Sequence, residues 1–195
     1  FNSIVAGNRC YGSSRYGGGV YGYYSYYGYS LLRNCLVFGN STTNAAGAGG
    51  TGDGLQFYGS AMLENCTVAN NTGQGIGRQT GGFMVTVTNS IVWGNGDDIY
   101  DPQGGGSNIK LGWSDIGNGD NNGTNGCISN NPFFMNTNAA DYRLSANSPC
   151  IDKGTNQAWM AAAADLDGNK RLVGIRVDMG AYEYAPKIGM MVTIH

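Results

Sequence analysis

The chain has 195 residues, of which 34 are glycine, a formal net charge of −2 and only 12% charged residues. This length indicates one domain with room for a sizeable core, and a hydrophobic fraction of 41% is too high for a disordered chain. The weak negative charge excludes the basic stripe that a nucleic-acid partner requires, and no apolar run is long enough for a membrane-spanning helix.

A short phrase recurs four times in the first half of the chain. It reads NSIVAGN, NCLVFGN, NCTVANN and NSIVWGN, and it begins at Asn2, Asn34, Asn65 and Asn89, so the spacing is 24 to 32 residues. Glycine and β-branched residues are poor helix formers, which disfavours a helical repeat. The period, with short apolar runs and Gly/Asn corners, predicts a β-solenoid in which each coil stacks on the previous one.

Alternation within the phrase assigns the faces of the expected strands. In NCTV, Cys66 and Val68 share one face, and stacking about 4.8 Å apart then gives an inward column. That column is predicted at Val5, Val37, Val68 and Val92. The asparagines that close the phrases are Asn8, Asn40, Asn71 and Asn95. Because asparagine tolerates the left-handed conformation and can hydrogen-bond between coils, these residues predict tight corners and a stacked asparagine ladder.

The stretch YGYYSYYGYS, residues 21–30, lies inside one coil, between a Gly-rich strand and LLRNCLV. Its tyrosines are Tyr21, Tyr23, Tyr24, Tyr26, Tyr27 and Tyr29. Two interpretations stay open. Tyrosine is a good strand residue, so the rings can stack from coil to coil and cover the solenoid. The rings can also form a surface that stacks on sugar rings or on a partner protein.

Paired carboxylates are the weak catalytic candidates of this sequence. Asp97 and Asp98 in GNGDDIYDP superficially resemble the pair of a glycoside hydrolase, and with Asp101 they resemble the Ca²⁺ ligands of a lyase. A lyase also needs a base, and nothing in the sequence places Arg78 or Lys110 beside these carboxylates. A turn between coils is the alternative interpretation of this pair.

The segment DLDGN resembles the opening of a calcium loop, with Asp165, Asp167 and Asn169 at alternate positions. An EF-hand needs a bidentate Glu at its twelfth position, where this chain has Arg176. A tight Asp-Gly turn is the competing interpretation, and no cofactor other than Ca²⁺ is indicated.

The five cysteines do not divide into pairs. Cys35 and Cys66 occupy the same place in successive coils and are predicted to stack inside as small apolar residues, with a disulfide between them possible but not required. Cys127 and Cys150 flank the beginning of the end region, where a disulfide consistent with export to an oxidising compartment is expected. Cys10 is then left over.

The second half of the chain carries a family resemblance in the ordered series NNPFF, DYRL, SPCID, DLDGNKR and DMGAYEY. Residues 89–184 resemble the C-terminal part of secreted bacterial right-handed parallel β-helix proteins that end in a "choice-of-anchor Q" region. The earlier repeats resemble the pectate-lyase-like coils of the same proteins. The resemblance implies a pectin-lyase-like fold, export, and attachment at or release from the cell surface. Only APKIGMMVTIH follows Tyr184, so any anchor is expected to be absent, cleaved or outside this chain.

The sequence therefore predicts an all-β, right-handed parallel β-helix of four to six coils over residues 1–117. Residues 118–184 are expected to form an irregular cap of the same domain, and residues 185–195 a tail. The first coil begins abruptly, so earlier coils, another chain or self-association is expected to cover its strand edges.

The predicted function is a non-enzymatic extracellular or cell-surface protein, adhesin-like, whose Tyr-rich face binds a polysaccharide or a surface protein. A polysaccharide lyase or hydrolase with its site partly outside the chain is the alternative, and a trimeric phage-type fibre is a third. Nucleic acid is not an expected partner.

Overall fold

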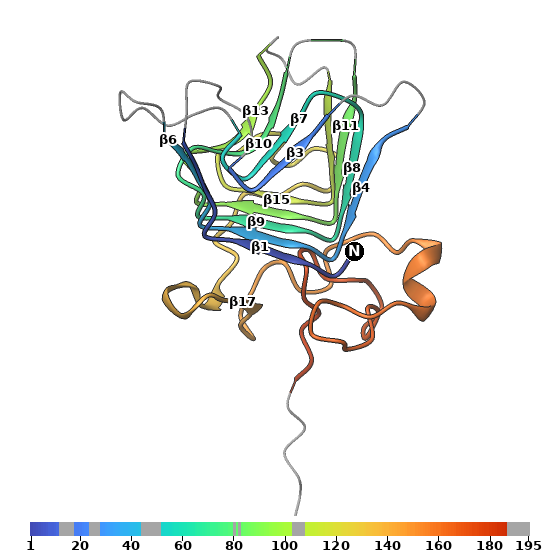
Figure 1. Ribbon diagram of the computed structural model, residues 1–195. Coiled ribbons are helices and arrows are strands. Elements are labelled where there is room, and N and C mark those ends of the chain that lie inside the picture. The colour runs from blue at the N-terminus through green and yellow to red at the C-terminus, as the bar shows by residue number, and fades with distance from the viewer. Residues whose placement is uncertain are drawn as a thin grey trace, which may run out of the picture.

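The computed structural model describes residues 1–11, 18–23, 28–43, 52–79, 81, 83–102 and 108–186. Three parallel sheets form the sides of a β-helix (Figure 1). Sheet 1 consists of β1 (Ile4–Ala6), β5 (Leu36–Phe38), β9 (Thr67–Ala69), β12 (Ile91–Trp93) and β15 (Asp115–Ile116). Sheet 2 consists of β3 (Val20–Gly22), β7 (Leu55–Phe57), β10 (Gln74–Arg78) and β13 (Asp97–Tyr100). Sheet 3 consists of β4 (Ser30–Arg33), β8 (Ala61–Glu64), β11 (Val85–Thr88) and β14 (Ile109–Gly112).

In each coil the chain passes from sheet 1 to sheet 2 and then to sheet 3, and the next coil pairs in parallel with the last. The predicted parallel β-helix is confirmed. At the first two coils, β2 (Arg9–Tyr11) and β6 (Ser41–Thr43) add a short parallel pair beyond sheet 1. No helix in the described residues is both long and apolar enough to cross a membrane.

Valines form the inward column of sheet 1, as the alternation predicts. The register pairs Val5 with Val37, Val37 with Val68, and Val68 with Val92. The last three are fully buried, whereas Val5 in the first coil is half-buried because no coil of the described structure covers it. Leucine, isoleucine and valine from sheets 2 and 3 complete one apolar core.

Left-handed residues turn the chain at both ends of the first four strands of sheet 1. Before the strand, φ is 50° or 51° at the phrase-opening residues Asn2, Asn34, Asn65 and Asn89. After the strand, the positive φ falls on Gly7, Gly39, Asn70 and Gly94. Glycine and asparagine adopt this conformation at the lowest cost. The closing asparagines follow one residue later and do not adopt it, so the prediction that they form the left-handed corner is wrong.

The closing asparagines instead turn their side chains inward and form the predicted hydrogen-bonded ladder. The backbone N–H and the Nδ2 of Asn40 both donate to Oδ1 of Asn71 at 3.0 Å, and Nδ2 also donates to the carbonyl oxygen of Val5. The same pattern joins Asn71 to Asn95. Facing glycines make room, since a Cβ on Gly54 would lie 2.9 Å from Nδ2 of Asn71.

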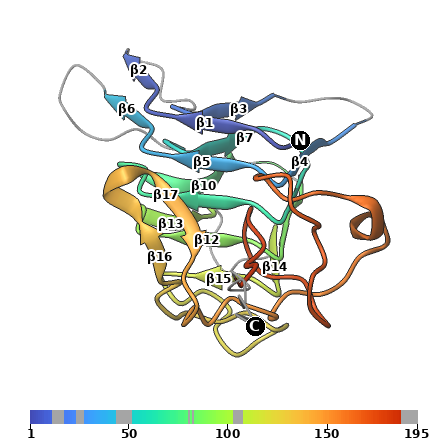
Figure 2. The same cartoon turned by 90° about the horizontal axis from the view of Figure 1, so that it is seen from below.

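Residues 117–127 close the end of the last coil, and Cys127 completes the core there. The rest of the C-terminal segment folds back over the outer face of sheet 1 (Figure 2). Its regular elements are β16 (Phe134–Asn136), η1 (Thr137–Ala139), β17 (Asp141–Leu144) and η2 (Ala158–Ala162). Apolar side chains of this segment pack on the outward residues of sheet 1.

The phrase-opening asparagines hold this segment by hydrogen bonds. Nδ2 of Asn65 donates to the carbonyl oxygen of Asp178 at 3.0 Å, and Nδ2 of Asn89 donates to that of Thr155 at 2.9 Å. The left-handed conformation that starts each strand thus also directs a polar side chain outward, to the C-terminal segment.

Asn71→Ala is expected to destabilise the protein by about 3 kcal/mol, because it removes four side-chain hydrogen bonds and leaves buried backbone groups unpaired. Asn8→Ala, at the exposed end of the same ladder, is the matched control and is expected to cost less than about 1 kcal/mol. Urea-unfolding midpoints measure both. Equal losses would show that the ladder adds no cooperative stability.

Candidate functional site

Aromatic rings stack along one outer edge of sheet 2. Tyr21 and Tyr23 come from the first coil, Tyr58 follows β7 in the second, and Phe83 follows β10 in the third. Ring centroids are 5.6 Å apart for Tyr23 and Tyr58, and 6.2 Å for Tyr58 and Phe83. Tyr21 and Tyr23 are 6.1 Å apart. We call these four residues the aromatic ladder.

The aromatic ladder is open to solvent at its first coil. Tyr23 is 69% exposed, and Met84, beside Phe83 in the chain, is 48% exposed. Tyr21, Tyr58 and Phe83 are half-buried, so the ladder is a contiguous, partly exposed aromatic surface, and such surfaces often mark interaction sites. The ladder is therefore the strongest candidate interaction surface in the described residues.

The structure describes three of the six tyrosines that the sequence indicated. Tyr21 and Tyr23 belong to the ladder, and Tyr29 is 58% exposed just before β4. Tyr24, Tyr26 and Tyr27 lie outside the described residues. The two open interpretations are compatible at Tyr23, because its ring stacks on the next coil and is exposed as well.

Tyr58 and Phe83 were missed by the sequence interpretation. The signal was available for Tyr58, which stands opposite Tyr23 by the register of β3 and β7. By the register of β7 and β10 that place in the third coil belongs to Gln79, and Phe83 lies four residues further on. The unequal loops between the coils concealed the correspondence.

Asp98 ends the asparagine ladder. Its Oδ1 accepts hydrogen bonds from the backbone N–H of Asn95 at 3.1 Å and from Nδ2 at 2.8 Å, as the next asparagine does in earlier coils. By the register of β12 and β15, Gly119 stands opposite Asn95, so the next coil offers no side chain. Asp98 is only 5% exposed, and burial raises the pKa of its carboxyl. Its position is thus explained by coil stacking.

Asp97 lies on the outer side of the same corner, at a cavity of about 340 Å³ that Trp93 also lines. We call it the Trp93 cavity. Nδ2 of Asn118 lies 3.4 Å from Oδ1 of Asp97 and 3.0 Å from Oδ2 of Asp120. The amide therefore stands between two carboxylates at the edge of the cavity.

Of the two basic residues of the lyase hypothesis, Arg78 lies beside Asp101 but is buried, and Lys110 lies on another sheet. Arg78 forms an ion pair with Asp101 at 2.8 Å, and both side chains are almost fully buried. Its guanidinium also donates to the carbonyl oxygens of Gln79 and Gly81. Lys110 is exposed on β14, in sheet 3. A catalytic base must reach the substrate, and a buried, paired Arg78 does not.

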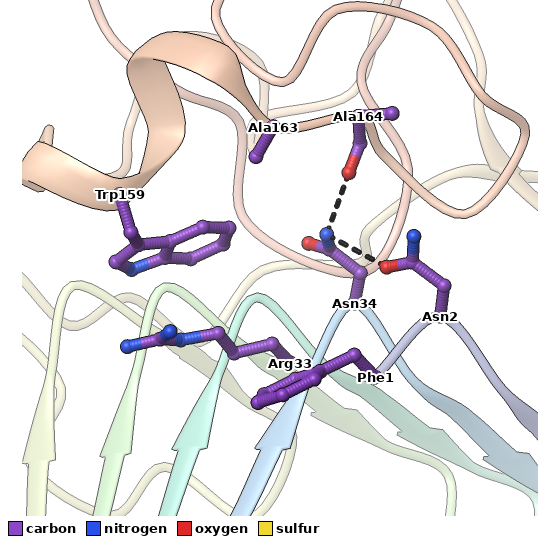
Figure 3. Close-up of a pocket in the computed structure, with 7 residues that line it drawn as sticks. All are labelled: Phe1, Asn2, Arg33, Asn34, Trp159, Ala163 and Ala164. Carbon is purple, nitrogen blue, oxygen red and sulfur yellow. Dashed lines mark hydrogen bonds between the residues drawn. The ribbon is translucent and has the colours of Figure 1, made fainter.

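A second cavity, of about 280 Å³, lies where the C-terminal segment meets the first coils. The guanidinium of Arg33 is held between two rings, 4.7 Å from the centroid of Trp159 and 5.6 Å from that of Phe1 (Figure 3). Its Nε pairs with the carboxylate of Glu64. Nδ2 of Asn34 donates to Oδ1 of Asn2 and to the carbonyl oxygen of Ala164 in the C-terminal segment (Figure 3). These contacts fasten the C-terminal segment to the β-helix.

The DLDGN segment forms a tight turn around Asp165. Oδ1 of this residue accepts the backbone N–H groups of Asp167 at 3.0 Å and Asn169 at 2.8 Å, and Oδ2 accepts that of Glu183 at 2.8 Å. No group of three acidic, histidine or cysteine side chains in the described residues is arranged to hold a metal ion. Calcium binding at this turn stays a prediction.

The expected disulfide between Cys127 and Cys150 is not formed, so that prediction is wrong for this structure. Cys127 lies in the core inside sheet 1, whereas Cys150 lies on the outer face with Ile91. The thiol of Cys150 donates instead to Oδ2 of Asp115 at 3.1 Å. Cys35 and Cys66 stack in the core as predicted.

No family model matches the chain, and no curated protein matches it in sequence. The chain is similar in structure to the pectate lyase Pel9A, with a TM-score of 0.51 and 14% sequence identity. The match covers 93% of this chain and 51% of the other, so the chain spans about half the length of that protein. At this identity the similarity shows the parallel β-helix fold alone. The resemblance to "choice-of-anchor Q" proteins stays a prediction.

Asp115→Asn is expected to flatten the pH dependence of stability between about pH 4 and pH 7. The carboxyl of Asp115 is fully buried, and burial raises its pKa to about 6, against about 3.9 in an unfolded chain. The protonated form is therefore favoured by folding, so this stabilisation is complete below about pH 4 and is lost as the pH rises through 6.

The effect is on the order of 2 kcal/mol and is measured by urea unfolding at a series of pH values. Asp120→Asn, at an exposed carboxylate, controls for the loss of one charge. An unchanged pH slope in Asp115→Asn would contradict the assignment. Asp178, whose pKa burial also raises to about 6, keeps its own contribution in both proteins.

Proposed function

We propose that this chain is a non-enzymatic extracellular or cell-surface β-helix protein that binds polysaccharide through the aromatic ladder. The observation that carries the proposal is the stack of rings from Tyr23 through Tyr58 to Phe83, one from each of three successive coils. Export and surface location are proposed from the family resemblance and from the pectate-lyase neighbour.

Stacking supplies the affinity in this proposal. The flat apolar face of a sugar ring packs on an aromatic face, and tyrosine adds a hydroxyl that can hydrogen-bond to the sugar. The ladder repeats with the coils, so a polymer of repeating sugar units can meet several rings at once. Because the rings already stack on one another, little side-chain conformational entropy is lost when they bind.

The alternative, a polysaccharide lyase or hydrolase, has support only from the fold, and fold does not determine function. Asp98 is engaged in the asparagine ladder and Arg78 in a buried ion pair, so the described residues offer Asp97 without a matched acid or base. A partner protein on the same aromatic surface and a trimeric fibre rank behind sugar binding.

The double variant Tyr23→Ala/Tyr58→Ala is expected to weaken retention by a polysaccharide by about 10- to 100-fold, because each stacked ring contributes about 1 kcal/mol or more. Affinity electrophoresis in gels that contain neutral or acidic polysaccharides measures the retention, and the same samples are assayed for reducing and unsaturated ends. Tyr11→Ala is the matched control, since Tyr11 is 72% exposed on β2, outside the ladder.

Unchanged retention in the double variant would remove the ladder as the binding surface. New chain ends would establish the enzyme instead. A chain that no polysaccharide retains would overturn the proposal.

A further inference from the structure

We propose that the Trp93 cavity is a second sugar site, which takes one neutral sugar residue of the bound polymer. The inference rests on the proposed function and deepens it by naming the class of sugar. The cavity lies at the corner from sheet 1 to sheet 2, at the start of β13, whereas Tyr23 and Tyr58 follow the ends of β3 and β7. The two sites therefore lie at opposite ends of the strands of sheet 2, on the order of 10–15 Å apart along the strand direction.

The size of the cavity suits a single sugar unit. Its volume of about 340 Å³ is near the lower limit of ligand pockets, about 300 Å³. Gly117 packs directly against the wall of the cavity, because a Cβ there would lie 2.4 Å from Oδ2 of Asp98 and 3.1 Å from the ring of Trp93. A side chain at this position would displace Trp93 or Asp98, so glycine is required for the present shape of the lining.

The lining combines the two kinds of contact that sugars need. Trp93 provides an apolar wall, and the carboxylate of Asp97 is a strong acceptor for sugar hydroxyl groups. Asn118 presents its amide at the same edge, where it donates to Asp120 and fixes the carboxylates in place. Because that amide already stands between two carboxylates, the arrangement favours hydroxyl recognition over a bare cation.

The charge of the lining excludes an acidic sugar. The residues around the cavity are Trp93, Gly94, Asn95, Gly96, Asp97, Asp98, Gly117 and Asn118, with two carboxyl groups and no basic side chain. A uronate would bring its carboxylate against Asp97 without a cation to compensate, and like charges at such distances repel. A neutral hexose meets carboxylate acceptors for its hydroxyl groups, the amide of Asn118 and one aromatic wall.

Tryptophan fluorescence of the intact chain tests the proposal. The chain is titrated with glucose, galactose and mannose, and separately with galacturonate and glucuronate, with and without Ca²⁺. A neutral sugar is expected to change the emission, and Trp93→Phe is expected to remove the change. Trp159→Phe, in the cavity beside Arg33, is the matched control and is expected to keep it.

Asp97→Asn is the second variant, because Trp93 also packs on the apolar cluster outside sheet 1 and its replacement can affect folding. It is expected to weaken neutral-sugar binding about tenfold, through the loss of a charge-assisted hydrogen bond, without a shift of the unfolding midpoint. Asp167→Asn removes an exposed carboxylate elsewhere and is expected to bind as the unmodified chain does.

Binding of uronates equal to or tighter than that of neutral sugars, binding that requires Ca²⁺, or no response to any of the five sugars would overturn the proposal. Unchanged affinity in Asp97→Asn would do the same. Polysaccharide retention with a silent cavity would leave the aromatic ladder as the only site. A responsive cavity in a chain that no polysaccharide retains would instead remove the proposed role of the ladder.

Discussion

Coil-to-coil register is the constraint on which the rest of this structure depends, and the buried asparagine ladder fixes it. Each closing asparagine binds the backbone and the side chain of its neighbour, so a coil shifted by one residue would leave buried amide groups unpaired. Equivalent residues of successive coils are therefore held one above another. The valine column inside sheet 1 and the stack of Tyr23 on Tyr58 outside sheet 2 follow from the same register.

The C-terminal segment covers the outer face of one sheet of the β-helix and leaves the aromatic ladder uncovered. It covers sheet 1, where a buried ion pair joins Arg171 to Glu183 at 3.1 Å and burial raises the pKa of Glu183 to about 8. Fully desolvated ion pairs contribute little net stability. They do specify one arrangement of the segment, since any arrangement that separates the partners leaves a buried charge unpaired. Sheet 2 carries the aromatic ladder, and the Trp93 cavity lies at the corner between sheet 1 and sheet 2, where no residue beyond Asn118 lines it.

Features that repeat were predictable from the sequence, and features that occur once were not. The valine column and the asparagine ladder could be predicted because the same residue type returns at the same place in four phrases. The left-handed corners were assigned to the wrong residues, since spacing alone does not distinguish a side chain that turns inward from a backbone that turns left-handed. Cys127 lies inside sheet 1 and Cys150 outside it, because of the way the C-terminal segment folds back. The sequence of that segment has no repeat from which this path could be predicted.

The end of the repeat explains why the Trp93 cavity occurs where it does. In a solenoid every coil offers the same groups at the same spacing, which suits recognition of a polymer but creates no unique pocket. The asparagine ladder stops at Asn95 because Gly119 follows in the next coil, and Asp98 takes the vacant place from its own strand. Because Asp98 points inward to accept these hydrogen bonds, its neighbour Asp97 points outward, beside Trp93 and Gly117. The Trp93 cavity, which we propose binds a single sugar, is thus a consequence of the end of the asparagine ladder that holds the coils together.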